Sequence, residues 1–239
     1  MPEIKAILFD FGGTLDSDGY DWPVRIYDFI SKRTEPGDFQ QFLSHVRNAA
    51  NAMTDMVDTI TLDMDQTAVR LCQGIHKQMD DNWSVDDIAE EFIETARKHL
   101  ARNTEVLARL SVDYRLGCVS NNWGNVAGWC RQYGIARYFD TIIDSTVVQS
   151  VKPEPGIFNA ALTELNIAAE NCAYVGDNFQ CDVVGAHDVG MKPIWIKHPE
   201  ACTSIAGCFV DGRDKIDPTT INPIQIQSLP ELTGLLIPR

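Results

Sequence analysis

The sequence has little positive charge and no long apolar segment. Lys and Arg number 20 against 34 Asp and Glu, so the formal net charge is −14. Such a surface repels nucleic-acid phosphates and anionic lipid, so we expect neither nucleic acid nor a membrane as a partner. No cationic stretch leads into a long apolar run at the N-terminus, and we therefore expect no signal peptide and no membrane span.

Cysteines also lack an ordered pattern. There are seven of them, and no C-x-x-C pair occurs, which argues against a structural zinc site. An odd number without a repeated framework predicts reduced thiols and a cytoplasmic location. The length of 239 residues permits one large domain, or one domain with a smaller insert. Nothing in the sequence separates a monomer from a homodimer.

What the sequence does contain is an alternation of short apolar runs and helical segments. Residues 4–9 predict a buried strand that ends at Asp10, followed by a glycine turn. Further strands are expected at 116–119, 141–143, 172–175 and 193–196. Helices are expected at about 125–133, 156–165, 177–189 and 228–236. This alternation indicates an α/β fold whose parallel sheet carries helices on both faces.

A long segment between the first two strands has helical periodicity and little strand character. Its apolar residues fall on helical stripes, and Ser84 followed by Asp87 resembles a capping box at the start of one helix. These helices could form a compact bundle. We therefore predict a core domain made of residues 1–19 and 104–239, interrupted by a helical domain of residues 20–103.

The expected carboxyl ends of the strands, where such sheets bind ligands, carry polar residues. Asp10 stands at the first of these ends, where a carboxylate can attack phosphorus or carbon. Gly12 and Gly13 follow it and allow the backbone to approach a ligand closely. A strand followed by a tight turn with a solvated Asp would give the same pattern.

Two further segments could bind an anion. Ser120 and Asn121 offer a hydroxyl and an amide between a strand and a helix, although such residues are also routine helix N-caps. Lys152 lies between prolines that would hold it in place, and an ammonium group neutralises phosphate well. A lone lysine is more often a solvated surface residue.

Asp177 and Asp182 bracket a predicted turn between strand and helix. Mg²⁺ prefers oxygen ligands, commonly one or two carboxylates together with water and phosphate. The same pair of acids could instead cap the helix and stabilise its first turn. Taken alone, this segment does not distinguish the two interpretations.

In this order the four segments resemble the motifs of the haloacid dehalogenase superfamily of hydrolases. The first motif, Asp-x-Asp-x-Thr, matches residues 10–14, and the other three match Ser120, Lys152 and the pair Asp177 and Asp182. The resemblance covers nearly all of the chain outside the helical segment. It implies a Rossmann-like α/β core with an inserted α-helical cap that closes over the site and selects the substrate.

The resemblance also implies a role for each matched residue. Asp10 would be the nucleophile and would bind Mg²⁺ together with the backbone carbonyl of Gly12 and the side chain of Asp177. Asp182 would orient a metal-bound water or Lys152, which shares catalysis with Asp10. The residues expected to hold the transferring phosphoryl group of a small phosphorylated substrate are Thr14, Ser120, Asn121 and Lys152.

Position 12 departs from the family pattern. The phosphatases have a second Asp there, which protonates the leaving alkoxide and then activates water, whereas this chain has Gly12. General acid–base catalysis contributes roughly 10²–10⁴ in rate. Because the metal ligand at this position is the backbone carbonyl, we expect Gly12 to leave metal binding largely intact.

A Mg²⁺-dependent phosphatase that acts through an aspartyl-phosphate remains the favoured function. Either the natural substrate has a good leaving group, or another acid near the helical segment supplies the proton. The candidate acids are Asp16, Asp18 and Asp21.

Two alternatives remain open. Family enzymes that cleave carbon–phosphorus or carbon–halogen bonds also lack the second Asp, although the halide enzymes do not need the metal acids. The phosphonate enzymes require a cap lysine that forms a Schiff base, for which this chain offers Lys32, Lys77 and Lys98. The other alternative is a regulatory module that binds phosphate or metal and has lost turnover.

Overall fold

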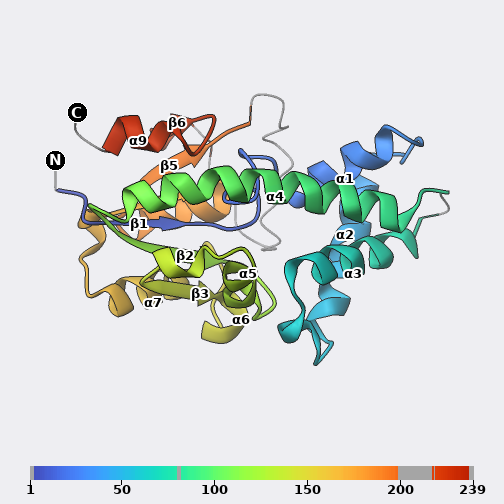
Figure 1. The fold of residues 1–239 in the computed structure, drawn as a ribbon, viewed down its shortest axis with the longest axis horizontal. Coiled ribbons are helices and arrows are strands. Elements are labelled where there is room, and N and C mark those ends of the chain that lie inside the picture. Colours follow the sequence, from blue (N-terminus) through green and yellow to red (C-terminus); the bar gives the residue numbers. More distant parts are fainter. Residues whose placement is uncertain (1–2, 80–81, 199–216, 218, 237–239) are drawn as a thin grey trace.

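The computed structural model describes residues 3–79, 82–198, 217 and 219–236. A six-stranded sheet lies at its centre in the order β3-β2-β1-β4-β5-β6, and all neighbouring strands are parallel (Figure 1). The expected α/β fold is therefore confirmed. The strands are β1 (Ala6–Phe9), β2 (Arg115–Ser120), β3 (Thr141–Asp144), β4 (Cys172–Gly176), β5 (Lys192–Ile196) and β6 (Ile224–Ile226).

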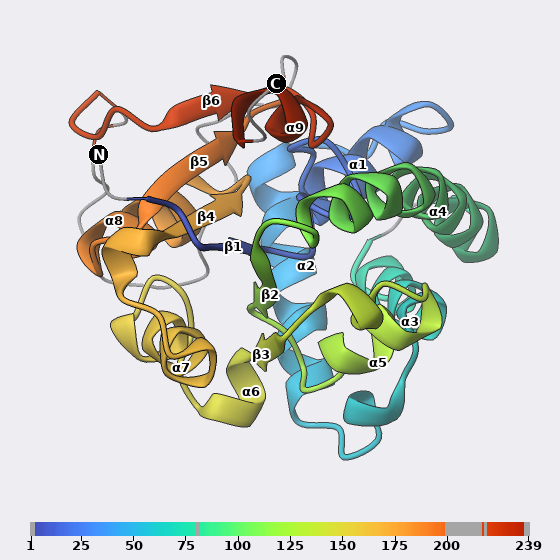
Figure 2. The same ribbon diagram turned by 60° about the vertical axis from the view of Figure 1, so that its left-hand side comes forward.

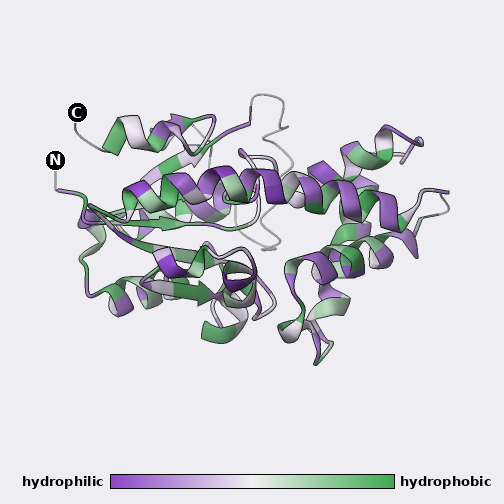
Figure 3. Cartoon of the chain, viewed as in Figure 1, coloured by the Kyte–Doolittle hydropathy of each residue, from purple (hydrophilic) through white to green (hydrophobic). Residues whose placement is uncertain are grey.

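Both faces of the sheet are covered by helices. On β1, Ala6 and Leu8 pack with α7 and α8, whereas Ile7 and Phe9 face the side of α4, α5 and α9. Figure 2 shows these two groups of helices on opposite sides of the strands, and Figure 3 shows the strands as mainly hydrophobic. Burial on both faces explains why the strands are continuous apolar runs. The helices named are α4 (Val85–Leu110), α5 (Val126–Gln132), α7 (Pro155–Leu165), α8 (Gly185–Asp188) and α9 (Glu231–Leu236).

The predicted helical segment between the first two strands comprises α1 to α4, which we call the helical insert. Helices α1 (Trp22–Ser31), α2 (Phe39–Thr54) and α3 (Met64–His76) lie beyond the carboxyl ends of the strands (Figure 1). Each insert helix begins at a side chain that accepts a backbone N–H, as expected for N-caps. These caps are Asp21, Asp38, Asp63 and Ser84.

Helix α4 joins the insert to the core without a break. The domain boundary predicted between residues 103 and 104 falls inside this helix. Near that point, the buried Asn103 donates from Nδ2 to the carbonyl of Leu15, 2.9 Å away, and so ties the helix to the loop after β1. No helix in the described part of the chain is both long and apolar enough to cross a bilayer.

Some local features differ from the sequence predictions. Strand β6 and the short helix α6 (Ser145–Val148) were not predicted, because three or four residues give too little periodicity to recognise. The helix expected after Asp177 is a π-helix (Phe179–Val184) that leads into α8. Short 3₁₀ turns also occur at Thr59–Thr61, Ala136–Tyr138 and Ala169–Asn171.

The expectation of reduced thiols holds at four of the cysteines. Cys72, Cys118, Cys130 and Cys172 are free and buried among apolar side chains. Cys181 is disulfide-bonded, so the expectation is wrong there. Cys202 and Cys208 lie outside the described residues.

A buried ion pair fixes the start of the insert against the core. Asp16 and Arg25 are both at most 1% exposed, and Arg25 Nη1 lies 2.8 Å from Asp16 Oδ2. Asp16 also accepts from the Gly13 amide at 2.7 Å and from the Trp22 indole at 2.8 Å. Its carboxylate therefore connects the turn after β1 with the first helix of the insert.

We predict that Arg25→Met lowers the free energy of unfolding by about 3–5 kcal/mol, because it leaves the Asp16 charge buried without its cation. Arg33→Met is the matched control. Its ion pair with Glu91 is partly exposed to solvent, and we expect a loss below about 1 kcal/mol. Urea denaturation measures both values, and equal losses would contradict the anchoring role.

Candidate active site

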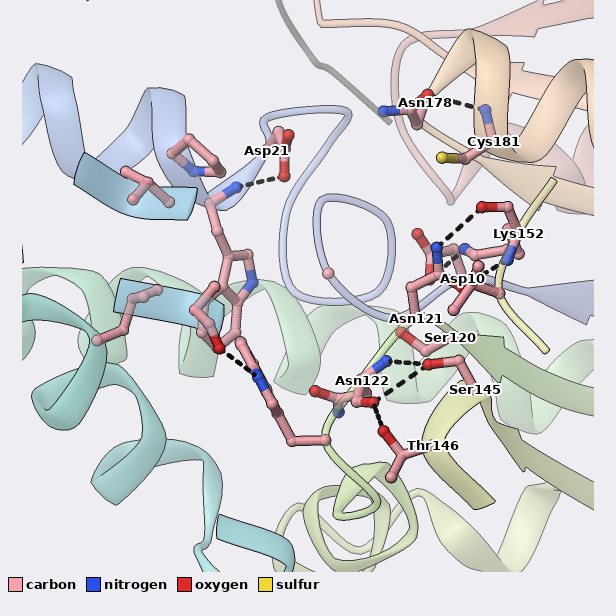
Figure 4. Close-up of a pocket in the computed structure, with 18 of the residues that line it drawn as sticks. Asp10, Asp21, Ser120, Asn121, Asn122, Ser145, Thr146, Lys152, Asn178 and Cys181 are labelled. Carbon is pink, nitrogen blue, oxygen red and sulfur yellow. Dashed lines mark hydrogen bonds and ion pairs between the residues drawn. The ribbon is translucent and has the colours of Figure 1, made fainter. Parts of the chain in front are cut away.

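The polar residues predicted at the strand ends meet at the centre of the sheet. The strand order runs outward in both directions from β1, and the ends of β1, β2 and β4 carry Asp10, Ser120 and Asp177. Such a change of direction leaves a crevice at the carboxyl ends of the strands. Figure 4 shows Asp10, Ser120 and Lys152 gathered in this crevice, with the insert opposite.

The two carboxylate oxygens of Asp10 differ in their contacts. Its Oδ1 accepts from the Phe11 amide at 2.7 Å and lies 2.8 Å from Lys152 Nζ. The Asp10 amide donates to the Val175 carbonyl at 2.9 Å, which locks the residue to β4. Among the described residues no hydrogen bond to Oδ2 is made, so this oxygen can approach an electrophile.

Lys152 is a buried cation rather than a solvated surface lysine. It is 2% exposed, and Nζ lies 2.8 Å from Asp10 Oδ1 and 2.7 Å from Asp182 Oδ1. Burial acts to lower its pKa, but the charges of Asp10 and Asp182 outweigh burial and raise the pKa above its usual value. The ammonium therefore stays protonated and balances the two carboxylates.

Two polar side chains hold Lys152 in place. Nζ also donates to the Tyr174 hydroxyl at 3.1 Å, and that hydroxyl donates to the Val119 carbonyl at 2.9 Å. Asn121 accepts from the Lys152 amide at 2.7 Å and donates to its carbonyl at 3.2 Å. Sequence reasoning missed Tyr174, because a tyrosine inside an apolar strand looks like an ordinary core residue.

Asp10, Asp177 and Asp182 form an acidic cluster suited to a hard cation. One carboxylate oxygen from each lies within 4.8 Å of the others. Burial raises the pKa of Asp177 well above its ordinary value, and the charges of Asp21, Asp182 and Asp10 add to the rise. A divalent cation would offset this crowding of negative charge, and an all-oxygen donor set fits Mg²⁺.

Two glycines allow the cluster to be this compact. Gly13 has φ of +81°, and a Cβ there would lie 2.4 Å from an Asp177 oxygen. A Cβ on Gly176 would lie 2.3 Å from the carboxyl carbon of Asp182. A side chain at either position would push an acid out of the cluster, so the glycines fix the spacing of the carboxylates.

Of the predicted phosphate-binding residues, Ser120, Asn121 and Lys152 line the cavity, and Thr14 does not. Ser120 lines it, and its hydroxyl makes no hydrogen bond within the described part of the chain. Thr14 is fully buried and lies outside the cavity lining, and its hydroxyl donates to Asp177 Oδ1 at 3.3 Å. Asn121 lines the cavity, but its amide is bound to the Lys152 backbone as described above.

The space beside Gly12, where an acid would stand in the family pattern, is filled by Trp22. A Cβ on Gly12 would lie 3.2 Å from Trp22 Nε1. The indole cannot easily withdraw, because it donates to Asp16 and stacks on Trp129 with ring centroids 5.5 Å apart. The chain therefore has no acid at position 12, and the Trp22 indole leaves little room beside it.

The three candidate replacement acids have different surroundings. Asp16 is buried in its pair with Arg25, and Asp18 is bound by Arg102 through oxygens 2.6 and 2.8 Å away. Neither lines the cavity beside Asp10, whereas Asp21 does. Burial raises the pKa of Asp21 to about 7, with contributions from the charges of Asp10, Asp16 and Asp182 and an opposing one from the Trp22 amide.

The cavity itself has a volume of about 380 Å³ and combines core and insert residues. The core supplies Asp10, Ser120 and Lys152, and helix α2 of the insert supplies Arg47 and Asn51. Trp22, Trp123 and Trp129 make part of its wall apolar. The lining therefore combines charged and polar groups with an apolar wall, as is common in small-molecule sites.

Comparison with known proteins identifies the family of this chain. A model of the haloacid dehalogenase-like hydrolase family matches residues 4–190. The chain is 38% identical over 98 residues to the glyceraldehyde 3-phosphate phosphatase of Pyrococcus abyssi, covering 39% of this chain and 40% of that protein. It is 28% identical over 153 residues to human haloacid dehalogenase-like hydrolase domain-containing protein 3, covering 64% and 53%. The matched part thus spans about half or less of these relatives.

Solved structures share the fold. A dehalogenase determined as an intermediate complex aligns over 100% of both chains with a TM-score of 0.64, at 18% sequence identity. At this identity the likeness concerns the fold and not the reaction. Because the family model covers most of the sequence, including the segments that carry Asp10, Ser120, Lys152 and Asp177, this chain belongs to the haloacid dehalogenase-like hydrolases.

Proposed function

We propose that this chain is a Mg²⁺-dependent phosphatase that hydrolyses a small phosphorylated substrate through a phosphorylated Asp10. The observation that carries the proposal is the pairing of Asp10 with the buried Lys152 beside the Asp177 carboxylate. Phosphoryl transfer needs positive charge around the transferring group, so that an anionic nucleophile can approach it. The phosphatase named among the relatives supports the same class of reaction.

Asp10, the Gly12 carbonyl and Asp177 would hold the metal, which would neutralise phosphate oxygens and orient the group. Asp10 Oδ2 would attack phosphorus, and the leaving oxygen would depart on the opposite side. Lys152 would share the negative charge with the transferring group, and the Ser120 hydroxyl would donate to one of its oxygens. Thr14 would position Asp177 rather than touch phosphate, since its hydroxyl already donates to that carboxylate.

The phosphonatase alternative lacks support at the site. Its Schiff base needs a lysine from the insert, but Lys32, Lys77 and Lys98 are exposed and none lines the cavity. Lys32 instead pairs with Glu91 at 2.9 Å. The dehalogenase alternative leaves the metal acids Asp177 and Asp182 without a use. The remaining alternative is a module that binds phosphate or metal without turnover, and measurements of phosphate release test it.

We expect Asp10→Asn to abolish phosphate release from 4-nitrophenyl phosphate, because the amide is a poor nucleophile and a weaker metal ligand. Chelation of Mg²⁺ in the unaltered protein should have the same effect and should be reversed when Mg²⁺ is added back. Phosphate release measures both. Substantial turnover by Asp10→Asn would show that another group attacks the substrate.

Variants at the two remaining acids should separate metal binding from the positioning of Lys152. We expect Asp177→Asn to raise the Mg²⁺ concentration needed for half-maximal rate by at least ~10-fold. Asp182→Asn should leave that concentration nearly unchanged and lower kcat, because the carboxylate lies 2.7 Å from Lys152 Nζ. Titration of the rate with Mg²⁺ distinguishes them. A matching rise in both variants would make Asp182 a direct metal ligand.

A further inference from the structure

The acid that the family pattern places at position 12 is missing, yet another carboxyl group lines the same cavity as Asp10. The titratable side chains among the described residues of the cavity lining are Asp10, Asp21, Arg47, Lys152 and Asp177, with Cys181 disulfide-bonded. Asp10 and Asp177 have roles in the proposed function, and Arg47 and Lys152 are cations that cannot serve as carboxylic acids. Asp21 is the acid that remains.

Asp21 is attached so that one oxygen is fixed and the other is available. Its Oδ1 accepts from the Trp22 amide at 2.7 Å, which caps helix α1. No hydrogen bond to Oδ2 is made within the described part of the chain. Figure 4 shows Asp21 at the start of α1, on the insert side of the cavity and across from Asp10. A leaving group opposite the attacking oxygen of Asp10 would depart toward this side.

The start of helix α1 accounts both for the missing acid at position 12 and for the carboxyl group that could replace it. Trp22 occupies the space beside Gly12, as its indole nitrogen would lie 3.2 Å from a Cβ there. Asp21 immediately precedes Trp22 and lines the cavity. Asp16 fixes this arrangement, because it binds the Gly13 amide, the Trp22 indole and Arg25 together.

We propose that Asp21 is the general acid and base of this enzyme, in place of the aspartate lost at position 12. The inference rests on the proposed phosphatase function. As Asp10 forms its bond to phosphorus, the bond from phosphorus to the leaving oxygen breaks and that oxygen takes the proton of Asp21. The Asp21 carboxylate then takes a proton from the water that attacks the phosphorylated Asp10. Phosphate leaves, and both aspartates return to their starting forms.

The electrostatic surroundings of Asp21 agree with two-way proton transfer. Asp10, Asp16, Asp177 and Asp182 crowd it with negative charge, and Arg47 and Lys152 are the cations of the same cavity. Burial raises the pKa of its carboxyl, and the charges of Asp10, Asp16 and Asp182 add to the rise. A raised pKa favours the protonated form that a general acid needs, and the ionised form can then act as the base.

The test compares Asp21→Asn with the unaltered protein on phenyl phosphates that differ in leaving group but hardly in shape. Asparagine caps a helix as well as aspartate does, so the variant keeps the start of α1 and loses only the proton. With 4-methoxyphenyl phosphate, a poor leaving group, we expect kcat/KM to fall by at least ~100-fold. With 4-nitrophenyl phosphate, phosphorylation of Asp10 should stay near the rate of the unaltered protein.

The second half-reaction gives an independent readout. Because 4-nitrophenolate leaves without a proton but water still needs a base, Asp21→Asn should release one equivalent of nitrophenolate rapidly and then turn over slowly. Phosphorylated protein should accumulate in that variant. Asp38→Asn is the control, since Asp38 also caps a helix, accepting from the Gln41 amide, but is exposed and outside the cavity.

The outcomes separate the two proposals. If the unaltered protein releases no phosphate from any of these esters, the phosphatase function fails and the role of Asp21 fails with it. If the unaltered protein is active and Asp21→Asn matches it on every ester, only the role of Asp21 is overturned. An equal loss on all esters without a nitrophenolate burst would also overturn it, because it would show that Asp21 acts only as a helix cap.

Discussion

The buried ammonium of Lys152 is the interaction on which the rest of the site depends. It lies within 2.8 Å of Asp10 and 2.7 Å of Asp182, and all three residues are buried. Without the cation, the two carboxylates would repel each other in a low-dielectric environment and would take up protons. Asp182 approaches closely only because Gly176 has no side chain, and Tyr174 and Asn121 restrain the lysine.

A second constraint acts where the helical insert meets the core. Asp16 and Arg25 form a buried pair that fixes the turn after β1, and the Trp22 indole is drawn into the same network. Trp22 thereby closes the space beside Gly12. The residue before Trp22, Asp21, brings a carboxyl to the cavity. A small residue at position 12 accommodates the indole, since a Cβ there would lie only 3.2 Å from Trp22 Nε1.

Part of the fold could be predicted directly from the sequence. The alternation of apolar runs and helical segments predicted the α/β sheet, because both faces of each strand are buried and leave a continuous apolar pattern. The short strand β6 and helix α6 were missed because their few residues carry no usable periodicity. The boundary placed at residue 103 lies inside α4, because a helix long enough to serve both core and insert shows the same amphipathic pattern throughout.

The sequence by itself determined the family resemblance, the strand ends that carry Asp10, Ser120 and Asp177, and the absence of an acid at position 12. These depend on residue type and order along the chain, which local pattern and motif spacing record. Only the tertiary structure decided that Lys152 is buried between two carboxylates, that Thr14 contacts Asp177, and that Asp21 rather than Asp16 or Asp18 lines the cavity. All three acids are near in sequence and alike in chemistry. Their environments differ because Arg25 and Arg102, brought in from separate helices, bind Asp16 and Asp18, whereas Asp21 lines the cavity.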